Sequence, residues 1–286
     1  MSVKAVALFS GGLDSVLATR LMLDQGIHVT ALHIRTNLSY VDRARMLGEL
    51  SPQDPLPVET SASILGVELK LIDVFDEYLP VVLEPRYGYG SGMNPCVDCR
   101  IFLLHKAKQW MEEHNFNFVF TGEVVGQRPK SQMKPTLRTV ERDSGLRGYL
   151  LRPLSAKLLE PTIPELKGWV DRERLFGMSG RGRKQQIALA AELGIAEYAQ
   201  PSGGCCYLID QTYSRRLRDV LARGEASLLD RTCTQLLAAG RHFRLPDGTK
   251  VVVGRNERGA AYCAGGARNG VWLRATDYAG PTALVL

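Results

Sequence analysis

Short apolar runs alternate with amphipathic stretches along the first three quarters of the chain. Residues 3–10 form an apolar run suited to a buried strand, and apolar positions recur at helical spacing over residues 14–25. Gly26 ends this helical pattern, and residues 28–34 form a second apolar run. A strand, an amphipathic helix and a second strand make one β-α-β unit, which predicts a parallel sheet.

The pattern beyond this unit predicts a doubly wound α/β domain built on one parallel sheet. Further strands are predicted at residues 68–74, 117–121 and 149–154, and helices at residues 58–65, 98–114, 161–170, 184–193 and 213–222. Residues 36–57 are polar and contain prolines, so we expect a loop with a partial helix there. Residues 87–95 are rich in glycine and tyrosine and are predicted to form another loop.

The pattern changes at residues 224–227. Beyond them, short apolar runs at 243–245, 250–253 and 271–274 are separated by glycine-containing turns, which is typical of short strands. We therefore expect two domains, an α/β domain over residues 1–223 and a small β-rich module over residues 224–286.

The composition is that of an ordinary globular protein, with 45% hydrophobic and 23% charged residues among 286. No apolar run approaches the roughly 18–20 residues of a membrane span, and the first residues lack the features of a signal peptide, so we expect a cytoplasmic protein without a membrane partner. The net charge is +6, and residues 127–184 hold fourteen basic and six acidic residues. Such a surplus attracts a polyanion such as RNA, although a solvated surface has the same pattern.

The sequence SGGLDS at residues 10–15 lies between the first strand and the first helix. Two glycines let the backbone approach an anion closely, and the N–H groups of the helix start then point at it. Ser10 and Ser15 add hydroxyl donors, and Asp14 is placed to hold magnesium or to cap the helix. The alternative is a plain tight turn. The chain has neither G-x-x-x-x-G-K-[ST] nor G-x-G-x-x-G, which excludes the kinase-type and dinucleotide-type phosphate loops.

Six cysteines in a cytoplasmic chain are not expected to form disulfides. Cys96 and Cys99 are spaced C-x-x-C, and Cys205 and Cys206 are adjacent about 110 residues later. This pattern indicates a metal, a cluster or redox chemistry. Cys233 and Cys263 stand alone and are interpreted as small apolar residues.

The SGGLDS motif resembles the PP-loop of the ATP pyrophosphatase superfamily, which cleaves ATP to AMP and pyrophosphate. The resemblance implies an ATP site with Mg²⁺. Its expected residues are Ser10, Gly11, Gly12, Leu13, Asp14 and Ser15, with His33 and Gly122 also contributing. Thr121-Gly122-Glu123 stands where tRNA 2-thiouridylases of this superfamily have T-G-H.

Asn94-Pro95-Cys96-Val97-Asp98-Cys99 resembles the segment that carries the first catalytic cysteine of the tRNA 2-thiouridylases. Cys99 takes the catalytic position, and Cys96 replaces the usual aspartate. The segment from Ser202 to Tyr207 resembles the one with the second cysteine, and Cys206 fits that position better than Cys205. Asp14, Cys99 and Cys206 are therefore the candidate catalytic residues.

The resemblance extends to tRNA thiolation enzymes that hold a 4Fe–4S cluster through three cysteines. It implies Cys96, Cys99 and Cys206 as ligands, with Cys205 as a possible substitute, since thiolates hold iron–sulfur clusters well. Three ligands would leave one iron open for a hydrosulfide. Two alternatives stay open. Cys99 and Cys206 could carry and resolve a persulfide without a cluster, or structural zinc could use Cys205 as the fourth ligand.

Two basic loops in the α/β domain are candidate RNA-binding segments. The first contains Arg128 and Lys130, and the second contains Arg181, Arg183 and Lys184; both types of side chain bind phosphate groups. The module resembles the RNA-binding domain of the NFACT family through Gly240-Arg241-His242-Phe243-Arg244 and Val253-Gly254-Arg255-Asn256, among other segments. The resemblance implies that Arg241 and Arg255 contact RNA.

Together these features predict an ATP-dependent tRNA sulfurtransferase that adenylates a base carbonyl and replaces its oxygen by sulfur. The expected partners are a tRNA and a sulfide or persulfide donor, and the sequence specifies no oligomeric state. A PP-loop ligase or amidotransferase that acts on a small carboxylate would need the phosphate loop but not the cysteines. A non-catalytic RNA-binding protein would bind RNA and ATP without releasing pyrophosphate.

Overall fold

The computed structural model describes residues 2–51, 53–199, 205–254, 270–277 and 280–286. Its larger part contains a five-stranded sheet in which every neighbouring pair of strands is parallel. The strands are β1 (Lys4–Leu8), β2 (His28–Arg35), β3 (Glu68–Asp73), β4 (Phe118–Thr121) and β5 (Leu150–Leu151), in the order β3-β2-β1-β4-β5. The order reverses between β1 and β4, where a ligand crevice is expected outside the carboxyl ends of the strands.

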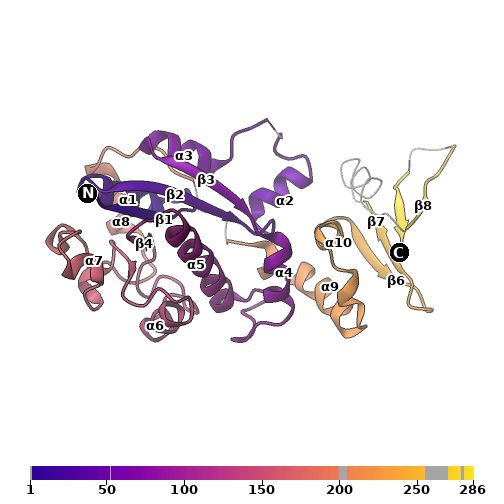
Figure 1. Cartoon of the computed structure of the whole chain (residues 1–286). Helices are drawn as coiled ribbons and strands as arrows, with labels where there is room; N and C mark the ends of the chain where they lie inside the picture. Colours follow the sequence, from indigo (N-terminus) through magenta and orange to yellow (C-terminus); the bar gives the residue numbers. More distant parts are fainter. Residues whose placement is uncertain (1, 52, 200–204, 255–269, 278–279) are drawn as a thin grey trace.

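Helices cover both faces of this sheet (Figure 1). On one face, a core cluster joins α1 (Leu13–Leu23), α3 (Pro57–Leu65) and α8 (Lys184–Glu192) to Ala5 and Ala7 of β1. On the other face, a second cluster joins Val6 to α4 (Phe75–Leu83), α5 (Cys96–Glu113), α6 (Lys134–Asp143) and α9 (Gln211–Ala222). Alternate residues of a strand point to opposite faces, so β1 is buried on both sides. The doubly wound α/β class is confirmed.

Several elements differ from the predicted ones for identifiable reasons. The partial helix expected within residues 36–57 is present as α2 (Tyr40–Met46), where Ser39 and Asp42 form a reciprocal capping box, whereas other elements were missed or are shorter. The helices α4 and α6 were not predicted. The helix predicted over 161–170 shrinks to α7 (Ile163–Leu166), since Gly168 has a φ of +66° just beyond it. Strand β5 is also shorter than predicted and ends before Pro153, which has no N–H to donate to a neighbouring strand.

The remaining short helices connect these parts. They are η1 (Ala156–Leu158), η2 (Arg172–Arg174), η3 (Tyr207–Ile209), η4 (Glu225–Leu228) and α10 (Arg231–Leu236). None of the helices in the described ranges is both long and apolar enough to cross a membrane.

The C-terminal module is a four-stranded antiparallel sheet in the order β6-β7-β9-β8. Its strands are β6 (Arg241–Arg244), β7 (Lys250–Val253), β8 (Val271–Leu273) and β9 (Ala283–Val285). Its small core joins Leu236 of α10 to Val252 and Leu284, with Trp272 packed against them. The β-rich module was predicted, but β9 was not.

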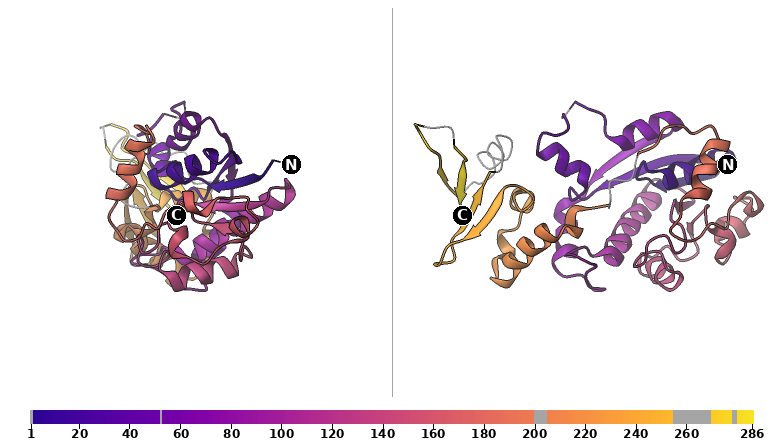
Figure 2. Two further views of the ribbon diagram at one scale, coloured as in Figure 1. Left: turned by 90° about the vertical axis from the view of Figure 1, so that its left-hand side faces the viewer. Right: turned by 180° about the vertical axis from the view of Figure 1, so that it is seen from behind.

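The carboxyl ends of the large sheet face the module. In Figure 1 the arrowheads of β2 and β3 point toward α9, α10 and the small sheet, and the view from behind in Figure 2 agrees. The edge of the large sheet where a ligand crevice is expected therefore lies on the side of the module.

Candidate functional site

The phosphate loop follows β1 and opens α1 as the sequence predicts. Gly12 is the N-cap residue of α1, and its lack of a side chain leaves the first-turn N–H groups without a side-chain cap. The Ser15 hydroxyl donates to the Gly12 carbonyl over 2.8 Å, and the hydroxyl oxygens of Ser10 and Ser15 lie 3.1 Å apart. The loop thus presents backbone donors, two hydroxyls and a helix N-terminus, which together suit a phosphate group.

Two glycines in this region are required by close backbone contacts. Gly11 has a φ of +75°, and a Cβ atom there would lie 2.8 Å from the Cα of Val58. A Cβ atom on Gly122 would lie 2.4 Å from the backbone carbonyl of Asp14. The end of β4 therefore packs directly on the first turn of α1.

Asp14 points one carboxylate oxygen at a partner and leaves the other one free. Its Oδ2 accepts a hydrogen bond of 2.9 Å from Gln127, while Oδ1 is buried without a hydrogen-bond partner in the described part of the chain. Burial raises the pKa of Asp14, and the Gln127 hydrogen bond and the charges of Arg183 and Arg128 oppose that rise. An unpaired carboxylate oxygen is the kind of donor that Mg²⁺ prefers, so Asp14 fits the expected magnesium ligand.

His33 anchors the start of the loop. Its Nδ1 lies 2.8 Å from the carbonyl oxygen of Phe9, the residue before Ser10, and burial lowers the pKa of the imidazole. A neutral imidazole that donates to this carbonyl fixes the loop backbone at the end of β1. A direct ATP contact from His33 stays a prediction.

Helix α5 begins with the first two cysteines. Cys96 is its first residue, and the Cys96 sulfur lies 2.9 Å from the amide nitrogen of Asn94. Cys99 packs against the second core cluster and shares a hydrogen bond with the Tyr78 hydroxyl. Burial raises the pKa of Cys99 to about 12, so its thiol is protonated at neutral pH.

The two cysteines of the second pair differ in exposure and in pKa. Cys205 is exposed, whereas Cys206 packs against the same cluster as Cys99. A hydrogen bond from Cys206 and the charges of Arg128 and Arg100 hold the pKa of Cys205 well below its usual range. The same hydrogen bond and burial raise the pKa of Cys206. Cys205 is therefore the thiol of this pair that is ready to react.

The cysteines interact electrostatically but do not form a metal site as they stand. The Arg100 guanidinium lies within electrostatic reach of Cys96, Cys99 and Cys205, which places these side chains around one region. Yet no group of three or more His, Cys, Asp or Glu side chains within the described ranges could hold a metal ion. Within the described residues the cysteines therefore form no ready-made cluster site, and the 4Fe–4S cluster stays a prediction.

Buried ion pairs connect the end of the C-x-x-C motif, at Arg100, to Thr121-Gly122-Glu123 at the end of β4, and the sequence analysis did not predict them. Glu123 is 3% exposed and lies 3.0 Å from the Nε atoms of both Arg100 and Arg152. Arg152 in turn contacts Glu141 at 3.1 Å. Burial opposes the charge of Glu123, but the two arginines outweigh it and lower the pKa of this carboxyl. The only sequence signal was the glutamate in place of histidine after Thr121-Gly122.

The basic residues predicted to bind RNA lie near Asp14 and Cys205, on the outer parts of the two basic loops, or on the module. Arg128 acts electrostatically on both Asp14 and Cys205, and Arg183 acts on Asp14. The two basic loops meet where the Gly180 N–H donates to the Val125 carbonyl over 2.8 Å. Lys130 donates to the carbonyl of Tyr89, and Arg181 and Lys184 are exposed. Arg241 is exposed on the module, and Arg255 and Cys263 lie outside the described residues.

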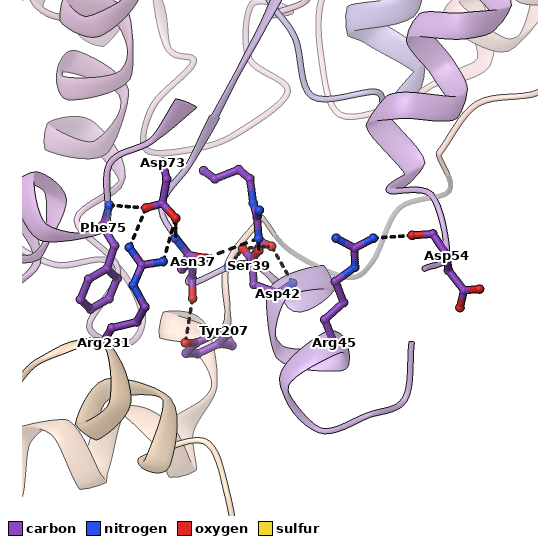
Figure 3. Close-up of polar contacts among 10 residues, drawn as sticks. Asn37, Ser39, Asp42, Arg45, Asp54, Asp73, Phe75, Tyr207 and Arg231 are labelled. Atoms are coloured by element: carbon purple, nitrogen blue, oxygen red, sulfur yellow. Dashed lines mark hydrogen bonds and ion pairs between the residues drawn. The ribbon is translucent and has the colours of Figure 1, made fainter. Parts of the chain in front are cut away.

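A polar network joins the module to the segment of the second cysteine pair (Figure 3). Arg231 of α10 binds both carboxylate oxygens of Asp73 at 2.7 and 2.8 Å, and its guanidinium lies 4.9 Å from the centre of the Phe75 ring. Asp73 accepts from the Asn37 side chain at 2.9 Å, and the Asn37 carbonyl accepts from the Tyr207 hydroxyl at 3.2 Å. One chain of contacts therefore runs from α10 to Tyr207, the residue after Cys206.

Two family models match this chain. The model described as the tRNA methyl transferase HUP domain matches residues 3–210, and the one described as the NFACT protein RNA binding domain matches residues 240–286. The second match confirms the resemblance of the module to the RNA-binding domain of the NFACT family, and the first, with the 2-thiouridylases among the relatives, confirms the resemblance of the larger part to that group.

Curated relatives are tRNA-modifying proteins. The tRNA-specific 2-thiouridylase MnmA of Thermotoga petrophila is 33% identical over 253 residues, which cover 85% of this chain and 67% of that protein. The protein of the same name from Mesoplasma florum is 24% identical, over 85% of this chain and 65% of its own. A probable tRNA sulfurtransferase of Methanothermobacter thermautotrophicus is 31% identical over 48% of this chain and 33% of its own. The chain spans about two thirds of the length of the two 2-thiouridylases it matches.

A solved structure also aligns with the fold. It is a predicted subunit of tRNA methyltransferase from Methanocaldococcus jannaschii, 15% identical over 66% of this chain and 76% of its own, with a TM-score of 0.39. Similarity at this level carries no functional information.

Proposed function

Because the chain belongs to the family of the tRNA methyl transferase HUP domain, we propose that it is an ATP-dependent tRNA sulfurtransferase. The observation that carries this proposal is the position of Arg128, whose charge acts on both Asp14 of the phosphate loop and the Cys205 thiol. That one arginine lies within electrostatic reach of both the nucleotide loop and a thiol supports a single reaction centre. The names of the relatives support tRNA as the substrate.

The phosphate loop activates the base. In this proposal the backbone N–H groups of residues 11–13 and the hydroxyls of Ser10 and Ser15 hold the β and γ phosphates of ATP. Asp14, whose Oδ1 has no hydrogen-bond partner among the described residues, would hold Mg²⁺, and the ion would supply charge neutralisation for the departing pyrophosphate. The carbonyl oxygen of the base attacks the α phosphorus, pyrophosphate leaves, and the base carries AMP as a good leaving group.

The thiols deliver the sulfur. A donor transfers a sulfur atom to one cysteine as a persulfide, whose terminal sulfur attacks the adenylated carbon and displaces AMP. The thiolate of a second cysteine then attacks the inner sulfur, which leaves a disulfide on the protein and the second sulfur on the base. Cys99 and Cys206 are the proposed catalytic pair. The exposed and ionised Cys205 supports a role in receiving sulfur from the donor.

The parts of the chain that contain the two sheets are proposed to have different functions. We propose that residues 1–223 carry the reaction and that residues 224–286 bind RNA. The match of residues 240–286 to an RNA-binding domain supports the second assignment. In the first unit, Arg128, Lys130, Arg181, Arg183 and Lys184 are proposed to contact the phosphates of ATP or of the tRNA backbone.

The test is a thiolation assay with matched cysteine variants. Unmodified tRNA, ATP, Mg²⁺ and a persulfide donor are incubated with the protein, and the tRNA is digested and searched by mass spectrometry for thiolated nucleosides. We expect Cys99→Ser and Cys206→Ser to abolish the product. Cys233→Ser is the control, because Cys233 lies on α10 and is not part of the proposed catalytic pair.

Other outcomes lead to other functions. Pyrophosphate release that needs neither tRNA nor Cys99 would replace the proposal with a ligase or amidotransferase that acts on a small carboxylate. RNA and ATP binding without pyrophosphate release would replace it with a binding protein. Iron and acid-labile sulfide, measured after purification without oxygen and absent from Cys99→Ser, would restore the cluster hypothesis and remove the persulfide step.

A further inference from the structure

The module has one covered face and one open face. Directly paired residues of an antiparallel sheet share a face, and successive residues alternate between faces. His242, Val252, Leu284 and Trp272 are paired in one row across β6, β7, β9 and β8, and this row packs on Leu236 of α10. The opposite face therefore belongs to the neighbouring rows of the same strands.

The open face is apolar and includes one basic side chain. Its two rows are Phe243, Val251, Val285 and Val271, and Arg241, Val253, Ala283 and Leu273. Phe243, Val271 and Leu273 are 50%, 64% and 55% exposed, and Arg241 is exposed as well. In Figure 1, α10 lies between this sheet and the α/β domain, so the open face is directed away from that domain. A contiguous apolar sheet face of this kind marks an interaction surface.

The charge of the module decides which partner suits this surface. Residues 240–286 hold seven lysines and arginines against three acidic residues, a net charge of +4, whereas the whole chain carries +6. Arg244 and Lys250 are compensated by Asp219 and Glu225, whereas Arg241 and Arg274 are exposed, so two copies of this surface would bring like charges together. A polyanion is attracted, and the match to an RNA-binding domain agrees with that choice.

We propose that this open face binds a single-stranded segment of RNA. Phe243 is its aromatic side chain, and Arg241 lies two residues away on the same strand and the same face. An unpaired base stacks on the exposed Phe243 ring, the neighbouring aliphatic side chains cover the adjacent base or sugar, and Arg241 contacts a phosphate. A duplex keeps its bases stacked on one another and cannot offer one to this ring. The inference rests on the proposed RNA-binding role of the module and adds the surface and the form of RNA.

The experiment measures binding of the full chain to two fluorescent RNA probes, a twelve-nucleotide single strand and a twelve-base-pair blunt duplex. We expect Phe243→Ala to weaken single-strand binding about tenfold, within the range measured for loss of one stacked base, and to change duplex binding less than twofold. Phe243→Tyr keeps the ring and should bind within twofold of the wild type. Arg241→Gln should weaken binding and lower the salt dependence by about one phosphate contact.

Matched controls come from the α/β domain. Leu166→Ala removes an apolar side chain that is more exposed than Phe243, since Leu166 is 74% exposed on α7, and Arg138→Gln removes one exposed positive charge from α6. Both should bind the single strand as the wild type does. Unchanged thermal melting of Phe243→Ala would establish that the fold is intact.

The outcomes separate this inference from the proposed function. If the wild type binds single-stranded RNA and Phe243→Ala and Arg241→Gln bind equally well, the surface is wrong while the sulfurtransferase proposal stands. If the chain thiolates tRNA but the wild type binds neither probe, the RNA-binding role of the module is wrong. A dimer that sediments as such in the wild type and dissociates in Phe243→Ala would overturn the inference in favour of self-association.

Discussion

The two sheets of this protein place their candidate sites in opposite ways. The five-stranded sheet is buried on both faces, so its functional residues gather at the edge where β1 and β4 end. The four-stranded sheet is covered by α10 on one face only and leaves the other face open. Burial on both sides supports exact positioning of a few groups for chemistry, whereas an open face supports broad contact with a partner. Each prediction below tests one side of this difference.

The largest expected effect is at the contact between β4 and α1. Gly122→Ala places a Cβ atom about one ångström too close to the Asp14 backbone, given the 2.4 Å separation, so the first turn of α1 must move. We expect ATP affinity, measured by calorimetry, to fall about a hundredfold, since phosphate binding depends on that turn. The control is Gly177→Ala, where an added Cβ meets its nearest atom, the Lys157 Cβ, at an ordinary contact distance of 3.5 Å. Equal affinities of both variants would show that the packing of Gly122 does not hold the site.

Removal of the buried charge of Glu123 comes next. Glu123→Gln leaves Arg100 and Arg152 facing a neutral side chain, and breaking a buried pair of this kind lowers the free energy of unfolding by about 3 kcal/mol. Urea denaturation measures the change. Arg138→Gln breaks the exposed pair with Glu160 and should lower it by less than about 1 kcal/mol. Similar losses in the two variants would contradict the role assigned to burial.

The module should lose stability in acid through His242. Burial, with the charges of Arg216 and Lys250, lowers the pKa of His242 to about 4 from the ordinary value of 6.5. The unfolded chain therefore takes up a proton between pH 6.5 and pH 4 that the folded chain does not. The stabilising contribution of neutral His242 is fully present above pH 6.5 and is lost as the pH falls toward 4.

The matching variant is His242→Gln, whose amide can still donate to the Leu236 and Ala239 carbonyls but does not titrate. We expect its free energy of unfolding, relative to the wild type, to rise by about 2 kcal/mol between pH 7.5 and pH 4.5. If the difference in the free energy of unfolding between the two proteins is constant with pH, His242 is not the cause of the loss of stability in acid.

The smallest effect is expected where the two units meet. The pair of Arg231 and Asp73 is partly exposed, with side chains 39% and 43% accessible, so its coupling energy should be about 1 kcal/mol, including the contact with Phe75. A double-mutant cycle with Arg231→Gln and Asp73→Asn measures it through thermal unfolding. A coupling energy of zero would show that this pair does not hold the module to the α/β domain.

The sequence-based predictions and the structure agree best where a functional motif consists of consecutive residues. The phosphate loop is six consecutive residues between a strand and a helix, so its conformation follows from its own glycines and from the helix start. The two cysteine motifs are also contiguous, and the sequence places Cys96 and Cys99 at the start of a helix, as observed. Distinguishing the ionised Cys205 from Cys206 depends on Arg128 and Arg100, which are distant in sequence.

The parts that could not be predicted depend on pairings across the fold. Glu123, Arg100 and Arg152 come from three separate segments, and no spacing rule joins them. The open face of the module depends on the register between β6, β7, β8 and β9, and a shift by one residue would bury Phe243 instead. The role of Asp14 as a magnesium ligand was predicted from its residue type, whereas the hydrogen bond that Gln127 donates to its other carboxylate oxygen follows only from the tertiary fold.

The central claim is that the phosphate loop and the thiols form one reaction centre. The direct test is to count, in a single reaction with tRNA, the AMP formed and the thiolated nucleosides produced. The account predicts one thiolated nucleoside for each AMP in the wild type, and loss of the thiolated product in Cys206→Ser. AMP formation by the wild type with no thiolated nucleoside, even when a persulfide donor is present, would contradict it, and so would an undiminished thiolated product in Cys206→Ser.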